Sequence, residues 1–184
     1  MLPTYTVPNI VPRHIRRPTW WLVGACSLLV ACAPDLSPSG SQASSFRTTV
    51  NHTTYQSGDI PILITVPHGG SDAPANVDER TTTYDDFVTS SEAYLQDIAE
   101  GVAARLYNTH GITPYMVIGE SDRLYIDYNR DEQILLGGGP ANEAYEDTDA
   151  NTYYDEYHSR IAGFVSTIQS SHGSGLLIDL HGTT

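Results

Sequence analysis

Three short apolar runs limit what this chain can fold into more than any other feature of its sequence. They occupy residues 61–67, 114–119 and 176–180, and each contains β-branched or other strand-forming apolar residues. A continuous apolar run of this length is typical of a strand that is buried on both faces. Two longer segments, 85–107 and 152–170, separate the runs in a β-α-β-α-β order. This order predicts an α/β fold in which a sheet lies between helices.

Both longer segments have the apolar spacing of a helix with one buried stripe. The stripe predicted for segment 85–107 is Val88, Leu95, Ile98, Val102 and Leu106. The stripe predicted for segment 152–170 is Tyr154, Tyr157, Ile161, Phe164, Val165 and Ile168. We therefore expect each helix to pack these residues against the sheet.

The first 32 residues have the pattern of an export signal. A basic stretch at 13–17 precedes an apolar run of twelve positions at 20–31, too short for a membrane-spanning helix, which needs about 20 residues. Residues 29–32 (LVAC) resemble a bacterial lipobox, in which Cys32 becomes the lipidated N-terminus. The alternative is an ordinary cleaved signal with a chance cysteine. We predict a signal peptide with lipobox at 1–32, a tether at 33–45 and one domain at 46–184. The protein is then exported and lipid-anchored on the bacterial cell envelope, on its periplasmic or cell-surface side.

Charge and composition exclude several function classes. All 22 acidic residues but only six of the nine arginines follow Cys32, which leaves the predicted mature protein with a net charge of −16. A surface this acidic disfavours binding to nucleic acid and to anionic lipid headgroups. We therefore expect contact with a membrane only through the lipid anchor. The chain has no lysine and no cysteine after Cys32. Schiff-base, P-loop and thiolate chemistry are therefore excluded within it.

Two histidines occupy equivalent places in the predicted fold. His68 directly follows the first apolar run and His181 directly follows the third. Because ligands bind outside the carboxyl ends of strands in open α/β sheets, both imidazoles could point into one crevice. Taken singly, either is more often a loop or core histidine. Two imidazoles, one carboxylate and a water are the ligands of a catalytic zinc site, so we predict zinc here.

The third zinc ligand is expected in the loop after His68 or in the first turn of the next helix. Asp85 and Asp86 are the leading candidates, with Asp78 and Glu79 behind them. Alternatively, Asp85 and Asp86 only stabilise the helix N-terminus through its dipole.

Two further sets of polar residues accompany the predicted zinc site. Asp179 lies two residues before His181 in a strand, hence on the same face, and could orient a zinc-binding imidazole. The segment RLYIDYNR brings together Arg123, Asp127, Asn129 and Arg130. Arg130 offers a planar fork suited to a substrate carboxylate, while Asp127 could hold either arginine. The alternative is an ordinary surface ion-pair cluster.

Four segments in order resemble the N-formylglutamate amidohydrolase family. They are VPHGG at 66–70, RLYIDYNR at 123–130, YYDEYH at 153–158 and LLIDLHG at 176–182. The resemblance implies a phosphorylase/hydrolase-like fold related to zinc carboxypeptidases, with a mixed, mostly parallel sheet flanked by helices. It also implies a zinc site made by His68, an acidic residue after it, and His181.

The resemblance carries expectations for the substrate side of the site. In carboxypeptidase-like relatives an Asn-Arg pair binds the substrate carboxylate. The resemblance assigns this role to Asn129 and Arg130 here. Tyr157 and His158 match the family's YH pair and are expected to line the pocket, although as helix residues they could equally be core and surface. The relatives' general-base glutamate is carried by a later strand. We therefore expect the catalytic base beyond Thr184 and a C-terminally incomplete domain.

The sequence thus predicts a zinc-dependent amidohydrolase. It would cleave an amide or peptide bond in a small molecule or short peptide with a free carboxylate. The alternative is a non-catalytic acidic surface lipoprotein that binds a ligand or partner. An esterase, suggested by HGG after a strand, is disfavoured because the chain has no G-x-S-x-G nucleophile motif.

The lipobox yields the first testable prediction. Cys32→Ser should abolish lipid attachment and release the protein from the membrane fraction, because Cys32 is the only thiol at the predicted cleavage site. The measurement is incorporation of labelled fatty acid in the source bacterium or a bacterial host, with Cys26→Ser as the matched control. Labelling of the Cys32→Ser variant would refute the lipobox.

Overall fold

The computed structural model describes residues 47–81, 87–132 and 143–182. Its centre is a five-stranded sheet with the order β1-β2-β4-β3-β5. The strands are β1 Arg47–Val50, β2 Thr53–Gln56, β3 Ile62–Val66, β4 Tyr115–Gly119 and β5 Leu176–Asp179. The last three confirm the strands predicted from the apolar runs. The predicted leader and tether lie outside the described residues and stay predictions, as does the domain boundary at residue 46.

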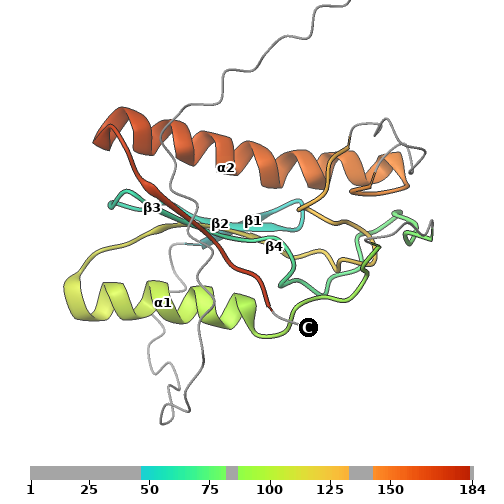
Figure 1. The fold of residues 1–184 in the computed structure, drawn as a ribbon, viewed down its shortest axis with the longest axis horizontal. Helices are drawn as coiled ribbons and strands as arrows, with labels where there is room; N and C mark the ends of the chain where they lie inside the picture. The colour runs from blue at the N-terminus through green and yellow to red at the C-terminus, as the bar shows by residue number, and fades with distance from the viewer. Residues whose placement is uncertain (1–46, 82–86, 133–142, 183–184) are drawn as a thin grey trace, which may run out of the picture.

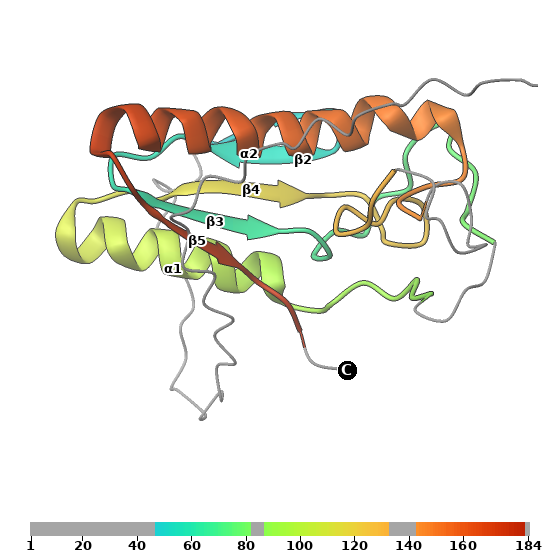
Figure 2. The same ribbon diagram turned by 45° about the horizontal axis from the view of Figure 1, so that its top comes forward.

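The sheet is mixed, which places the protein in the α/β class. β3 pairs in parallel with β4 and with β5, whereas β2 runs antiparallel to both β1 and β4. Figure 2 shows β3, β4 and β5 pointing the same way, opposite to β2. The prediction of a mostly parallel sheet was therefore too strong, because two of the four strand pairings are antiparallel.

The antiparallel part comes from a hairpin that the sequence analysis did not predict. Asn51 and His52 join β1 to β2, and both have positive φ angles, 45° and 52°. A two-residue hairpin turn favours this backbone because its twist matches that of the strands. Asn tolerates the conformation better than most residues, but without a following Gly the pair is a weak sequence signal.

Two helices cover opposite faces of the sheet (Figure 1). Helix α2, Asn151–His172, packs Tyr154, Tyr157 and Ile168 into one core, as predicted. Its start follows the 3₁₀ turn η2, Thr148–Ala150. Helix α1, Leu95–His110, covers the other face, where β3 and β4 contribute Ile64, Val66, Met116 and Ile118. No helix in the described part of the chain is long and apolar enough to span a membrane.

Helix α1 begins later than predicted, at Leu95 rather than residue 85. Its buried residues are Leu95, Ala99 and Ala103, whereas Ile98 and Val102 are 39% and 42% exposed. The predicted stripe was wrong at both positions because it favoured large apolar residues over alanines. The small side chains of Ala99 and Ala103 let the helix lie close to the sheet, which rotates Ile98 and Val102 outward.

The backbone at the start of α1 is strained, and this strain can be measured. Tyr94, the N-cap residue, has φ 66° and ψ 0°, while its side chain is largely exposed. A left-handed conformation costs a non-glycine residue roughly 1–2 kcal/mol. Tyr94→Gly should therefore raise the free energy of unfolding by about 1 kcal/mol in urea denaturation.

The matched control is Tyr107→Gly, the same substitution at a helical position of α1. It should lower the free energy of unfolding by about 0.5 kcal/mol, since glycine is the weaker helix former. Destabilisation by both substitutions would show that Tyr94 is not strained.

Candidate metal-binding site

Three side chains converge where the parallel strands end. His68 follows β3, His181 follows β5, and Glu92 lies just before α1. One possible ligand atom from each residue lies within 4.8 Å of the other two. The two imidazole rings are 5.1 Å apart, and the Glu92 side chain is only 9% exposed. The predicted convergence of the two histidines is therefore present in the structure.

The same nitrogen of each imidazole faces Glu92. Nδ1 of His68 lies 3.1 Å from Oε1 of Glu92, and Nδ1 of His181 lies 3.6 Å from Oε2. The other nitrogen, Nε2, faces an aspartate in both cases. His68 Nε2 is 2.7 Å from Asp127, and His181 Nε2 is 3.0 Å from Asp179. Each histidine thus lies between Glu92 and an aspartate of its own.

This arrangement fits a metal ion such as zinc. A histidine that binds a metal through one nitrogen commonly donates a hydrogen bond from the other to a carboxylate. With an ion bound beside Glu92, each aspartate would accept the proton on Nε2, and each Nδ1 could then donate its lone pair to the ion. Two neutral imidazoles and a carboxylate are three of the ligands that zinc uses in catalytic sites.

Backbone contacts hold Glu92 in this place. Its N–H donates to the carbonyl of His68 at 2.8 Å, and its carboxylate accepts a hydrogen bond from the backbone N–H of Gly182. A Cβ added at Gly182 would lie 3.3 Å from Cβ of Glu92, a tight contact. Glycine after His181 therefore permits the close approach between the end of β5 and the segment before α1.

Glu92 was missed in the sequence analysis, and a signal for it exists. The third ligand was expected near the start of the first helix, but that start was placed at Asp85. The segment Thr89-Ser90-Ser91-Glu92 has the S/T-x-x-E pattern that often marks a helix N-terminus. The helix starts only at Leu95, but the pattern would have moved its expected start from Asp85 toward Glu92. Asp85 and Asp86 lie outside the described residues, so the prediction for them is untested.

Asp127 is the most enclosed charged group of the site. Its side chain is fully buried and lies 2.8 Å from Nε of Arg123 and 3.8 Å from Nε of Arg130. A third guanidinium, that of Arg80, lies 3.9 Å away. Burial raises the pKa of Asp127, but hydrogen bonds and charge interactions with His68 and Arg123 outweigh it and lower the pKa to about 2. Asp127 is therefore an anion at any ordinary pH.

The two arginines predicted for the site differ in exposure. Arg123 is 9% exposed and lies between Asp127 and Glu92, with Nη1 3.6 Å from Oε1 of Glu92. Arg130 is 29% exposed, and Asn129 before it is exposed as well. The Asn129-Arg130 pair is thus better placed than Arg123 to meet a ligand from solvent.

Asp179 takes part in a second contact besides that with His181. Thr65, in the neighbouring strand β3, donates its hydroxyl to Oδ1 of Asp179 at 2.6 Å. The side chain is 32% exposed. The predicted contact with His181 is present, and Thr65 fixes the carboxylate that makes it.

His158 lies apart from these residues, on helix α2. Its ring packs 4.2 Å from that of Tyr154 and 5.3 Å from that of Tyr157. Burial lowers the pKa of His158, against a backbone hydrogen bond with Tyr128. The structure thus places His158 against the backbone of the RLYIDYNR segment, and its predicted contact with substrate stays a prediction.

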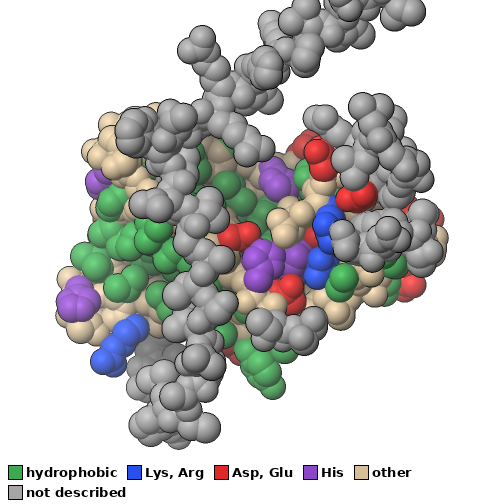
Figure 3. Space-filling model, in the orientation of Figure 1, with side chains coloured by type: hydrophobic (Ala, Val, Ile, Leu, Met, Phe, Trp, Pro, Cys, Tyr) green, Lys and Arg blue, Asp and Glu red, His purple; other side chains and the backbone are tan. Residues whose placement is uncertain are grey.

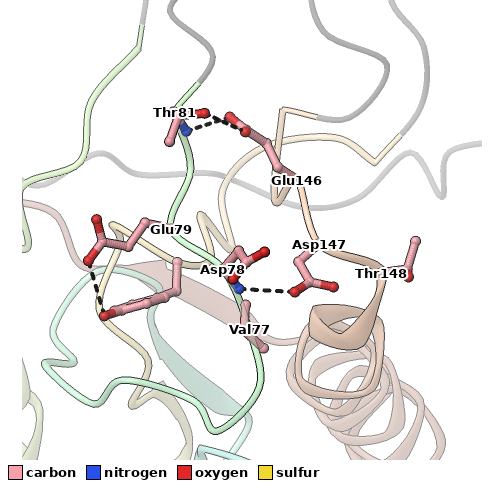
Figure 4. A pocket seen from close by; sticks show the side chains of 8 residues that line it. Val77, Asp78, Glu79, Thr81, Glu146, Asp147 and Thr148 are labelled. Atoms are coloured by element: carbon pink, nitrogen blue, oxygen red, sulfur yellow. Dashed lines mark hydrogen bonds between the residues drawn. The ribbon is translucent and has the colours of Figure 1, made fainter.

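A pocket lies apart from the His68, Glu92 and His181 group. It has a volume of about 850 Å³ and is lined by four acidic residues, Asp78, Glu79, Glu146 and Asp147. Figure 4 shows hydrogen bonds that join its walls: Thr81 donates to Glu146, and the backbone N–H of Asp78 donates to Asp147. These carboxylates tie the 78–81 loop to the chain just before α2. Asp78 and Glu79, the weaker candidates for the third ligand, therefore lie in this pocket.

The fold and the site define an α/β protein with a possible metal site at the carboxyl ends of its parallel strands. Histidine, acidic and basic side chains gather close together on one face of the molecule (Figure 3). A family model described as N-formylglutamate amidohydrolase matches residues 60–184, and the chain belongs to that family. The family points to a hydrolase of the amidohydrolase kind. Searches of curated proteins and of solved structures each found no match.

The contacts of Asp127 give a stability prediction. Asp127→Ala should lower the free energy of unfolding by about 3–5 kcal/mol, because it leaves the buried Arg123 guanidinium without its main partner. The measurement is urea denaturation of metal-free protein at pH 7. Asp72→Ala is the control, because Asp72 pairs with His52 but is 60% exposed, and it should cost less than about 0.5 kcal/mol.

The effect of Asp127→Ala should depend on pH. The pKa of Asp127 is about 2 in the folded protein against an ordinary value of 3.8, so ionised Asp127 stabilises the fold above pH 4. That contribution is lost as the pH falls through 2. The difference between wild type and variant should shrink by about 2 kcal/mol between pH 5 and pH 2. A difference that does not change with pH would contradict the lowered pKa.

Proposed function

We propose that this protein is a zinc-dependent amidohydrolase that cleaves an amide or peptide bond in a small substrate with a free carboxylate. The family supports amide hydrolysis. The observation that carries the zinc assignment is the paired orientation of His68 and His181. Both direct Nδ1 toward Glu92 and Nε2 toward an aspartate.

In this proposal zinc is held by Nδ1 of His68, Nδ1 of His181 and the carboxylate of Glu92. The ion would supply a Lewis acid that polarises the amide carbonyl and activates water for attack. Asp127 and Asp179 hold the two imidazoles in the tautomer that zinc requires. Arg123 neutralises part of the negative charge that Glu92 and Asp127 bring to the site.

The charges around Asp127 support an anionic substrate. Three arginines, Arg80, Arg123 and Arg130, lie within 4 Å of the Asp127 carboxylate, so three cations surround this one buried anion. The side chain of Arg130 is the most exposed of the three. It can bind a carboxylate through two parallel hydrogen bonds, and the exposed Asn129 amide can add a third.

Two finer assignments belong to the same proposal. We infer that the fold is of the zinc carboxypeptidase-like kind, which the mixed sheet between two helices is consistent with. We also infer that the protein is exported and attached to the cell envelope through Cys32. The basic stretch, the short apolar run and the LVAC sequence support this location.

Zinc content tests the proposed ligands. Wild-type protein should bind about one zinc per chain, and His68→Ala, Glu92→Gln and His181→Ala should each lose stoichiometric zinc. The measurement is elemental analysis after dialysis against a weak chelator, with circular dichroism to verify folding. His110→Ala, at the exposed end of α1, is the matched control and should keep its zinc. Normal zinc content in any of the three site variants would refute the shared site.

Arg130→Lys tests recognition of the carboxylate. A lysine keeps the charge but not the two-pronged geometry, so kcat/KM for a carboxylate substrate should fall roughly ten- to a hundredfold. The substrates are the best member of an N-acyl amino acid panel that includes N-formyl-L-glutamate, and its α-carboxamide. The fall should be confined to the carboxylate substrate, with zinc content unchanged. An equal loss on both substrates would make Arg130 only a structural partner of Asp127.

A further inference from the structure

We propose that Tyr154 of helix α2 positions Arg130 to bind the substrate carboxylate. It does so by a hydrogen bond to the backbone carbonyl of Arg130. The inference rests on the proposed function and extends it, because it assigns a positioning role to a residue outside the site itself. Three sets of contacts carry it: those of the tyrosine hydroxyl, those of its ring, and those of the segment that it holds.

The hydroxyl of Tyr154 is bonded to the backbone of the recognition segment. It donates to the carbonyl oxygen of Arg130 at 2.6 Å, a short hydrogen bond between residues 24 positions apart. Burial, and then nearby acidic groups, raise the pKa of Tyr154 to about 12. The hydroxyl therefore keeps its proton, and remains a donor, throughout the pH range of an enzyme assay.

The ring of Tyr154 is held rigidly among other aromatic rings. It is 8% exposed and lies 4.2 Å from the ring of His158, 5.6 Å from that of Tyr145 and 6.4 Å from that of Tyr128. A hydroxyl on a ring packed in this way has little freedom to move. Tyr154 therefore fixes the position of the Arg130 carbonyl rather than following it.

The segment around Arg130 is held from two sides. On the side of the metal site, Asp127 accepts from the backbone N–H of Asn129 with its carboxylate and from that of Arg130 with its carbonyl, both at 3.1 Å. On the side of α2, Tyr154 holds the carbonyl of Arg130, and His158, one helical turn further on, has a backbone hydrogen bond with Tyr128. Asp127 thus sets where the segment around Arg130 lies relative to His68. Helix α2 limits how far this segment can move away from the site.

This arrangement affects specificity because bidentate binding depends strongly on geometry. A displacement of about 1 Å in a binding group can remove a large part of its contribution to substrate binding. The Arg130 side chain is 29% exposed, so the position of its backbone determines much of where the guanidinium can reach. Loosening the Arg130 carbonyl should therefore weaken carboxylate binding and leave the metal ligands in place.

The test is Tyr154→Phe, which removes the hydroxyl and keeps the ring. Tyr153→Phe is the matched control, since Tyr153 neighbours it on α2 and packs against His52. The substrates are the same N-acyl amino acid and its α-carboxamide. Tyr154→Phe should lower kcat/KM for the carboxylate substrate about five- to tenfold, mainly through KM. The carboxamide should be affected less than twofold, and the control and the zinc content should match wild type.

Arg130→Lys, assayed in parallel, separates failure of this inference from failure of the proposed function. If Arg130→Lys reduces the difference in kcat/KM between the two substrates and Tyr154→Phe does not, Tyr154 has no positioning role. If Arg130→Lys does not reduce this difference in kcat/KM, the proposed carboxylate recognition is wrong, and the role inferred for Tyr154 is wrong as well. An equal loss on both substrates in Tyr154→Phe, or loss of its zinc, would mean that the residue is merely structural.

A second measurement does not depend on activity. Backbone amide hydrogen exchange in residues 128–132 should be about tenfold faster in Tyr154→Phe than in wild type and unchanged in Tyr153→Phe. Exchange that is unchanged in Tyr154→Phe would overturn the inference even if no substrate in the panel were hydrolysed.

Discussion

The hydrogen bond between Asp127 and His68 is the interaction on which the rest of the site depends. It joins the end of β3 to the segment after β4 across 59 positions of sequence. A buried carboxylate is costly unless it is fully partnered, and here it accepts from His68, Arg123 and the backbone of Asn129. Because one carboxylate has all these partners, the His68 ring cannot turn without disturbing the arginine segment. The candidate metal ligand and the candidate substrate-binding residues are therefore held in one relative position.

Much of the fold could be predicted, because apolar runs and strand ends are local features. The pattern of apolar residues predicts strands β3, β4 and β5 and helix α2. The proximity of His68 and His181 follows from their positions after parallel strands. The remaining features depend on information that a residue pattern does not contain. The β1-β2 hairpin needs two positive φ angles, and the buried face of α1 depends on alanines that pack closely. The error at α1 then hid Glu92, while the bond from Asp127 to His68 is a tertiary contact that RLYIDYNR alone cannot indicate.

The two sides of Asp127 have different tasks in the proposed enzyme. On one side His68, Glu92 and His181 form a group whose imidazoles are oriented by carboxylates, as a catalytic zinc site requires. On the other side Asn129 and Arg130 are exposed enough to meet a substrate, and Tyr154 supports them from α2. If the proposal holds, segment 127–130 would set the distance between the zinc ion and the recognised carboxylate. That distance would limit which amide bond of a substrate reaches the metal.

The central claim is that zinc binds between the two histidines through their Nδ1 atoms. It is tested most directly by a crystal structure of the zinc-loaded protein with anomalous diffraction measured on both sides of the zinc absorption edge. The account predicts one strong anomalous peak about 2.0–2.2 Å from Nδ1 of His68, Nδ1 of His181 and a carboxylate oxygen of Glu92. A peak bound through Nε2, or one found only among Asp78, Glu79, Glu146 and Asp147, would contradict it.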